Sequence, residues 1–258
     1  KGNPEQKLNE GGEKLLMGDF FTGNLVSFES GRMDVIASGF RGADAIEQDG
    51  SMIYVSSWPL GKVWSYNLST KEKKVLKDDL TTAADFYLDR KGKQLVVPDM
   101  LESKVHFLKL NDDGTAKLTK TLDTPSKPES VCRGFGGKLY VTMINGEEAG
   151  DGGINVIDGD EVMEFCRGMN SPKGIAFAGD YLVTADETTI WKVDADGNGE
   201  LTEAELTASA NRAADTLPNY ALPALNGGGA MEIFVSTAEG VCDFISAMDT
   251  ARIPEWNT

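Results

Sequence analysis

The chain has 258 residues, of which 40% are hydrophobic and 26% are charged, a composition typical of a chain that folds around a packed core. Its 41 acidic residues outnumber the 25 basic ones, and the formal net charge of −16 repels phosphate backbones and anionic lipid head groups, which argues against nucleic-acid and membrane partners. No run of about 18 apolar residues occurs, so no membrane-spanning helix is predicted.

Short apolar segments of β-forming residues recur along the chain, and each is followed by a turn and a second such segment. The first segments lie at 15–19, 53–57, 95–99, 139–143, 181–186 and 233–237. Their partners lie at 24–28, 62–66, 104–108, 153–157, 189–193 and 241–245. More polar third segments follow in most repeats and are predicted to face solvent at the edge of a sheet.

A further segment precedes each apolar run, and counting back from the run aligns one residue in every repeat. The aligned residues are Glu5, Asp44, Asp85, Glu129, Lys173 and Asn226. They recur at intervals close to the roughly 40–45 residues of a four-stranded propeller blade.

We therefore predict an all-β fold, a single six-bladed β-propeller domain over residues 1–258 with four-stranded blades. The predicted blades cover roughly 4–40, 41–80, 81–124, 125–169, 170–222 and 223–258. The composition of residues 202–217 favours a helix, which predicts a short helical insertion there.

The first strand of each propeller blade lines the central channel, so the six aligned side chains are expected to converge. Glu5, Asp44, Asp85 and Glu129 each carry −1 and Lys173 carries +1, a sum of −3. Crowded carboxylates take up protons or bind a cation, and oxygen ligands without Cys or His favour Ca²⁺ ahead of Mg²⁺ or Mn²⁺. Alternatively, these acids cap neighbouring turns or accept hydrogen bonds from backbone amides.

Other chemistries are excluded by what the sequence lacks. The single histidine, His106, rules out mechanisms that need several imidazoles, and it is predicted to be a packed strand residue. Cys132, Cys166 and Cys242 are far apart and form no CxxC pair, so we expect buried free thiols. No nucleophile elbow, P-loop or dinucleotide-binding glycine motif occurs, which excludes serine hydrolases, P-loop proteins and Rossmann enzymes.

Three segments of the chain resemble those of the gluconolactonase, regucalcin and strictosidine-synthase-like superfamily of six-bladed propellers. They are Gly39–Ile46, Asn170–Phe177 and Gly18–Leu25. The resemblance spans the whole chain and is more specific for the fold than for the chemistry. Lactonase-type members hold a divalent metal at the mouth of the channel, with a Glu from the first blade and Asn or Asp from later blades.

The resemblance implies that Glu5 is a metal ligand, and in an enzyme of this kind Glu5, Asp85 and Glu129 would be ligands or the general base. The chain departs from the family pattern at Pro172-Lys173-Gly174, where the family has Pro-Asn-Gly, and at Glu129, where an amide or Asp is expected. A protonated Lys173 cannot coordinate a metal. It could hold a carboxylate of the substrate, or it could replace the metal through an ion pair with Glu129 or Asp85.

A separate metal motif lies at 194–205, where the sequence matches an EF-hand loop. The expected ligands are Asp194, Asp196, Asn198, the backbone carbonyl of Glu200, and Glu205. The preceding segment is predicted to be a strand rather than the helix of a paired EF-hand, and Asp-x-Asp-Gly-Asn-Gly also makes a good tight turn. A structural Ca²⁺ site and a plain turn both remain open.

Two functions follow from these features. The first is metal-dependent hydrolysis of a lactone or ester-type small molecule, with Asp85, Glu129 and Lys173 as catalytic residues and Asp44, Lys173 and Asn226 in contact with the substrate. The alternative is a non-catalytic propeller that binds a small molecule in its central channel, or a protein partner, and uses calcium only structurally. The start at Lys1 rather than Met favours a secreted or periplasmic protein.

Overall fold

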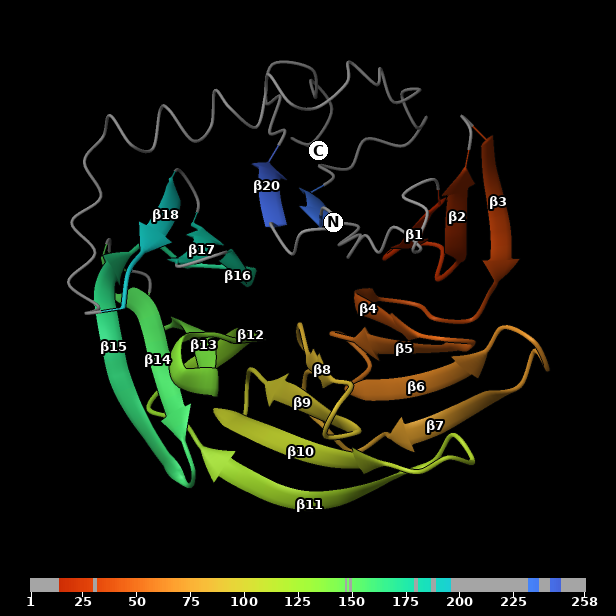
Figure 1. Cartoon of the computed structure of the whole chain (residues 1–258), viewed down its shortest axis with the longest axis horizontal. Helices are drawn as coiled ribbons and strands as arrows, with labels where there is room; N and C mark the ends of the chain where they lie inside the picture. Colours follow the sequence, from red (N-terminus) through yellow and green to blue (C-terminus); the bar gives the residue numbers. More distant parts are fainter. Residues whose placement is uncertain are drawn as a thin grey trace, which may run out of the picture.

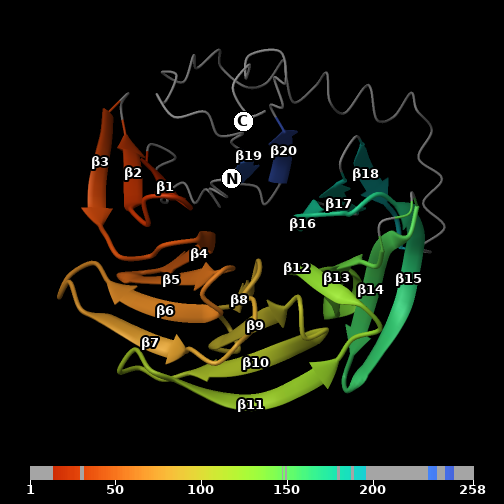
Figure 2. The ribbon, with the colours of Figure 1, turned by 180° about the vertical axis from the view of Figure 1, so that it is seen from behind.

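The computed structural model describes residues 14–29, 32–146, 148, 150–178, 181–186, 189–195, 232–236 and 242–246. Within these ranges the chain forms antiparallel sheets that follow one another around a central axis (Figure 1), and the view from behind shows the same ring (Figure 2). The fold is an all-β propeller, as the sequence predicts. No helix within the described ranges is long and apolar enough to span a membrane.

The sheets follow the chain in order, one blade after the next. Blade 1 contains β1 (Lys14–Gly18), β2 (Leu25–Glu29) and β3 (Arg32–Ala37). Blade 2 contains β4 (Ala43–Asp49), β5 (Met52–Ser57), β6 (Lys62–Asn67) and β7 (Lys73–Lys77). Blade 3 contains β8 (Tyr87–Asp89), β9 (Gln94–Asp99), β10 (Lys104–Leu110) and β11 (Ala116–Asp123).

The chain then completes the described part of the ring. Blade 4 contains β12 (Lys127–Arg133), β13 (Leu139–Ile144), β14 (Gly152–Asp158) and β15 (Glu161–Met169), with a short 3₁₀ turn, η1 (Phe135–Gly137), between β12 and β13. Blade 5 contains β16 (Ile175–Ala178), β17 (Tyr181–Ala185) and β18 (Ile190–Val193). A last pair consists of β19 (Glu232–Ser236) and β20 (Cys242–Ser246).

The predicted number of blades is wrong for the part of the chain that the structure describes. That part has five blades of three or four strands instead of six four-stranded blades, and β19–β20 form a sheet of only two strands. The sixth repeat does pair in the predicted way, because Ile233 faces Ile245 across this hairpin. The segments that were expected to complete blades 1, 5 and 6, and the predicted helix at 202–217, lie outside the described residues.

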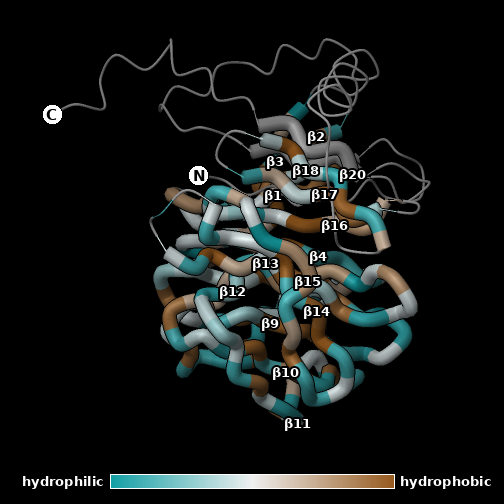
Figure 3. The backbone as a smooth tube through the Cα atoms, turned by 90° about the vertical axis from the view of Figure 1, so that its left-hand side faces the viewer, coloured by the Kyte–Doolittle hydropathy of each residue, from teal (hydrophilic) through white to brown (hydrophobic). Residues whose placement is uncertain are grey.

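The position of a strand within its blade decides which of its side chains are buried. The middle strands are covered by neighbouring blades on both faces, so β5 buries five of its six residues. The outermost strand β3 has only exposed or half-buried side chains, in line with the solvent-facing edge that the sequence predicts. Figure 3 shows the hydrophobic stretches lying within the stacked strands, separated by hydrophilic turns.

The hydrophobic core is divided among the contacts between neighbouring blades, which we call seams. Between blades 1 and 2 the fully buried Phe40 ring packs edge-on against Trp64 and Tyr66. Equivalent apolar clusters fill the next three seams. Two cysteines that form no disulfide lie in this region: Cys132 is buried, and burial raises the pKa of the half-buried Cys166 thiol to about 11.

Polar clips reinforce the seams. In three successive blades a hairpin ends in a left-handed residue: Gly23 between β1 and β2, Gly61 between β5 and β6, and Ser103 between β9 and β10, with φ of 71°, 57° and 54°. The carbonyl group of that residue accepts an N–H from the loop that leads into the next blade, at 2.8, 3.3 and 2.8 Å respectively. We call the loop that precedes each innermost strand the incoming loop.

Candidate functional site

The innermost strands of blades 2 and 4 carry a bulge where the sequence analysis placed its site residues. The register shifts between Ala43 and Ile46 and again between Pro128 and Val131, so two residues of the inner strand face one residue of the second strand. Asp44 and Glu129 are the first residues of these two bulges. They therefore occupy equivalent positions, as the counting of repeats predicts.

Lys173 occupies the corresponding place in blade 5, whereas in blade 3 Ala84 occupies it and the predicted site residue Asp85 lies one position later. The preceding residue Ala84 donates its N–H to Pro98 of the second strand at 3.0 Å, and Asp85 itself forms a parallel bridge with Ser130 of blade 4. The N–H of Lys173 binds the carbonyl of Ala185 at 2.8 Å. Four predicted site residues thus lie on, or directly before, the innermost strands β4, β8, β12 and β16, which surround the axis (Figure 1).

A network of buried hydroxyl groups links two of these positions, Asp85 and Lys173. The Ser130 hydroxyl, which is fully buried, donates to the Asp85 carboxylate with 2.5 Å between Oγ and Oδ2. The backbone N–H of Ser130 donates to Thr142 Oγ1 at 3.0 Å, and the Thr142 hydroxyl donates to the carbonyl of Lys173 at 2.8 Å. The chain of hydrogen bonds runs from blade 3 through blade 4 to blade 5, so the Asp85 side chain and the Lys173 backbone are positioned together.

The four predicted site residues differ in how deeply they are buried. Asp85 is 8% exposed, whereas Asp44, Glu129 and Lys173 are half-buried. A carboxylate that accepts a hydrogen bond from a buried hydroxyl is held in one orientation, so the Asp85 side chain is fixed in place. The half-buried side chains keep part of their surface exposed.

The predicted metal sites are only partly within the described residues. Glu5 and Asn226 of the ring lie outside them, as do Asp196, Asn198, Glu200 and Glu205 of the EF-hand-like loop. Asp194 is described and directly follows β18, which confirms that a strand leads into this loop. Within the described ranges no three His, Cys, Asp or Glu side chains lie together as a metal site.

The buried hydroxyl residues near these positions were not predicted from the sequence. Ser56, Thr142 and Thr184 lie on the second strands of blades 2, 4 and 5, and each is fully buried. Ser56 Oγ accepts the N–H of Ala45, and the Thr184 hydroxyl donates to the carbonyl of Gly174. In blades 2 and 4 the signal was a small hydroxyl residue in an apolar strand, opposite the bulge, whereas Thr184 pairs directly with Ile175.

Comparison with known proteins places the fold. Neither a family model nor a curated protein matches this sequence. A solved structure of a candidate gluconolactonase, a structural-genomics target, superposes with a TM-score of 0.57 at 17% identity over 72% of this chain and 72% of that one. The chain therefore shares a β-propeller fold with this structure, and an identity this low shows the fold alone.

Other propellers match equally well, so the fold does not select one activity. Streptogramin B lyase superposes with a TM-score of 0.57 at 13% identity over 74% of this chain. Hydrazine synthase of Kuenenia stuttgartiensis superposes with a TM-score of 0.59 at 13% identity over 76% of this chain. The chain spans 64% and 65% of the length of these two proteins.

Proposed function

We propose that this protein binds a small-molecule lactone or ester at the propeller axis and hydrolyses it. The observation that carries the proposal is the equivalent placement of Asp44, Glu129 and Lys173 in blades 2, 4 and 5, with Asp85 one residue after the equivalent position in blade 3. Three carboxylates and one ammonium group around one axis supply both a base and a cation for polarising a carbonyl group.

A divalent cation, Ca²⁺ first, is part of this proposal. The carboxylate oxygens of Asp85 and Glu129 have the chemistry that Ca²⁺ prefers, and when bound it would polarise the substrate carbonyl group. The described residues alone do not group three such ligands, so the metal site requires Glu5 or Asn226 to complete it.

The chain's own residues carry the proton transfers. Glu129 is half-buried and reachable by water, and it takes a proton from the water molecule whose oxygen forms the new bond to the substrate carbonyl carbon. The Lys173 ammonium group stabilises the negative charge that develops on the carbonyl oxygen. The ring C–O bond then breaks, and the alkoxide leaving group recovers the proton from Glu129. Asp85, oriented by Ser130, binds a hydroxyl group of the substrate.

The test is a panel of lactones and esters assayed with Ca²⁺, Mg²⁺, Mn²⁺ or Zn²⁺. Glu129→Gln should lower kcat about a hundredfold or more, since general-base contributions are about 10²–10⁴. The matched control is Glu161→Gln, because Glu161 is exposed on the outermost strand β15. If no substrate of the panel turns over with any metal, the hydrolase proposal is refuted.

The second candidate function is non-catalytic binding of a small ligand, and Lys173 favours it because a lysine replaces the amide ligand of metal-dependent relatives. Calorimetric titration with the same lactones and their hydrolysed acids separates the two functions. Tight binding of an acid without turnover of any lactone supports the binding protein. Loss of that binding in Lys173→Met, with unchanged stability, places the ligand carboxylate on Lys173.

We also propose that β19 and β20 belong to a sixth blade and that residues 194–205 bind Ca²⁺. In support, β20 lies beside β16 and β17 in the open sector of the ring (Figure 1). A calcium titration of the wild type and of Glu205→Gln tests the loop. If both proteins bind Ca²⁺ equally weakly, the loop is a plain turn and not a calcium site.

A further inference from the structure

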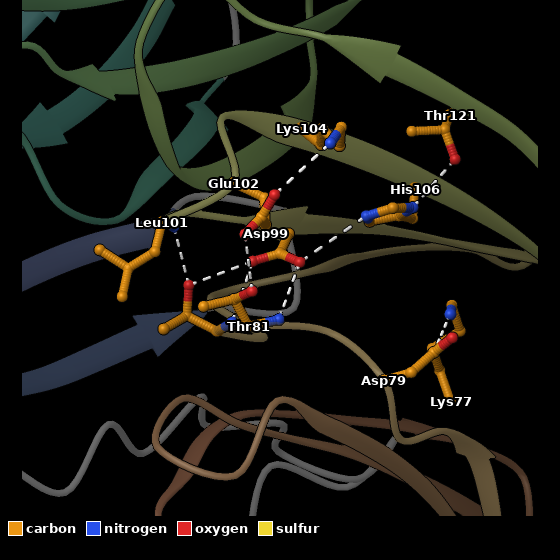
Figure 4. Close-up of polar contacts among 10 residues, drawn as sticks. Lys77, Asp79, Thr81, Asp99, Leu101, Glu102, Lys104, His106 and Thr121 are labelled. Atoms are coloured by element: carbon orange, nitrogen blue, oxygen red, sulfur yellow. Dashed lines mark hydrogen bonds and ion pairs between the residues drawn. The ribbon is translucent and has the colours of Figure 1, made fainter.

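A cluster of polar side chains lies in the seam between blades 2 and 3 (Figure 4), outside the ring of inner site residues. At its centre Asp99, 2% exposed at the end of β9, accepts the backbone N–H groups of Thr81 and Thr82 at 3.0 and 2.9 Å. Thr81 and Thr82 belong to the incoming loop of blade 3, which continues into Asp85. Asp99 therefore fastens the segment that positions a site residue.

Blade 5 contains the same fastening. Asp186 follows β17 and accepts the backbone N–H of Asn170 at 3.0 Å, in the incoming loop of that blade. Asn170 lies three residues before Lys173, whose N–H binds Ala185, just as Thr81 lies three residues before Ala84, whose N–H binds Pro98. The two aspartates thus have equivalent roles in two blades.

The two blades differ in the ring that faces this aspartate. In blade 5, Trp191 pairs with Thr184, two residues before Asp186, and its indole N–H donates to Asp186 with 2.7 Å between Nε1 and Oδ2. In blade 3, His106 pairs with Val97, two residues before Asp99. The His106 ring points at the carboxylate (Figure 4), but 3.9 Å separate Nε2 from Oδ2, and Nε2 is buried without a hydrogen-bond partner.

We propose that His106 is an acid-operated latch: protonation of its imidazole closes the gap to Asp99 and forms the hydrogen bond that Trp191 makes permanently in blade 5. A protonated imidazole has N–H donors on both nitrogens, so Nδ1 retains Thr121 Oγ1, now 3.0 Å away, while Nε2 donates to Asp99. Asp186 shows that one carboxylate accepts a ring N–H and an amide of the incoming loop together.

The charges that face His106 determine when the latch closes. Asp99 from β9 and Asp79 from blade 2 favour the protonated ring, whereas Lys77 of β7 and Lys104 of β10 oppose it. Lys77 pairs with Asp79, and Lys104 lies 3.5 Å from Glu102, which reduces the repulsion. Burial has the largest effect and lowers the pKa of His106 below its ordinary value, so the latch stays open near neutral pH.

Closing the latch regulates the proposed ligand site, and this consequence rests on the proposed function. An additional charge-assisted bond to Asp99 immobilises the carboxylate that holds Thr81 and Thr82. The incoming loop is then more rigid up to Asp85, whose carboxylate Ser130 already orients. Acidification should therefore order one side of the ring axis and leave blade 5 unchanged.

The experiment uses the fact that this protein has one histidine. Long-range ¹H–¹⁵N NMR of the single imidazole, recorded from pH 8 to pH 4.5, reports its titration and the proton on Nε2 without ambiguity. We expect a midpoint below about 6.5 and, in the acid form, a slowly exchanging Nε2 proton. Asp99→Asn should abolish that protected signal, whereas Thr121→Val should retain it.

Amide hydrogen exchange tests the mechanical consequence without any ligand. After correction for intrinsic rates, Thr81 and Thr82 should exchange about fivefold more slowly at pH 5 than at pH 7.5, the equivalent of one net hydrogen bond. Asn170 is the internal control and should show no such change. His106→Gln carries a permanent amide donor and should remove the pH dependence.

Free exchange of the Nε2 proton in the acid form, or unchanged protection of Thr81 and Thr82 on acidification, would overturn the latch. These results do not depend on ligand binding. The latch and the proposed hydrolase can therefore fail independently.

Discussion

Replacing Gly61 by alanine should destabilise the propeller far more than the same change at Gly50. Both glycines have φ of 57°, so both alanines would adopt the same unfavourable left-handed backbone conformation. A Cβ atom at Gly61 would lie 1.8 Å from the carbonyl oxygen of Leu80, whereas a Cβ at Gly50 meets nothing within 4 Å. The pair therefore separates steric conflict from backbone conformation.

The structure sets the magnitude. Left-handed backbone costs about 1–2 kcal/mol for alanine at either position, and this is the whole expected effect at Gly50. At Gly61 the incoming loop of blade 3 must also move away, which adds about 1–3 kcal/mol for overpacking. The hydrogen bond from the Leu80 N–H to the Gly61 carbonyl, worth about 1 kcal/mol, is lost as well. We expect the two variants to differ by about 2–4 kcal/mol.

Urea unfolding monitored by tryptophan fluorescence measures this difference from the midpoint and slope of each transition. The same Gly61→Ala variant should speed amide exchange at Thr82, because the displaced loop leads to that residue. If the two variants unfold within about 1 kcal/mol of each other, the clip between the hairpin and the incoming loop does not hold the seam, and the reasoning fails.

The remaining predictions concern burial, pH and metal. Phe40→Ala should cost about 3–5 kcal/mol of unfolding free energy because the ring is fully buried, whereas Phe21→Ala, at a side chain 59% exposed, should stay within about 0.5 kcal/mol. Because burial lowers the folded-state pKa of His106, its contribution to stability is complete above about pH 6.5 and is lost as pH falls through the folded pKa. A smaller acid loss in His106→Gln, measured by urea unfolding at pH 7.5 and 5, would confirm this sign. If the ring binds Ca²⁺, EDTA should lower the melting temperature of a Glu205→Gln variant and added Ca²⁺ should restore it. An unchanged melt would exclude the ring metal.

Counting residues found equivalent inner positions in blades 2, 4 and 5, because a propeller repeats one geometry, but in blade 3 it selected Asp85, one residue after the equivalent Ala84. The bulges at Asp44 and Glu129 begin at the residues that the repeat alignment selected. A strand register has a period of two residues, so a fixed interval between the apolar run and the preceding segment also fixes which side chain reaches the axis. The number of blades was harder to predict, since the described part of the sixth repeat contains only its two apolar strands.

The seams could not be predicted, because they join residues far apart in the sequence. The sequence around Ser130 does not predict that its hydroxyl group donates a hydrogen bond to Asp85, 45 positions earlier. The sequence likewise does not predict that His106 and Trp191 occupy equivalent positions in their blades. The two side chains share no chemistry beyond a ring N–H, and only the pairing register reveals that they face equivalent aspartates.

The residues at the ring axis are connected to the seams through the incoming loops. Each described inner residue is reached through an incoming loop, and the loop of blade 3 is held at two points, by Gly61 of blade 2 and by Asp99 of its own blade. If a ligand displaces Asp85 when it binds, it also strains the contacts that hold blades 2 and 3 together. A change in a seam should therefore alter affinity at the axis without touching the ligand, and this is why a titratable ring beside Asp99 matters for a site on the innermost strands.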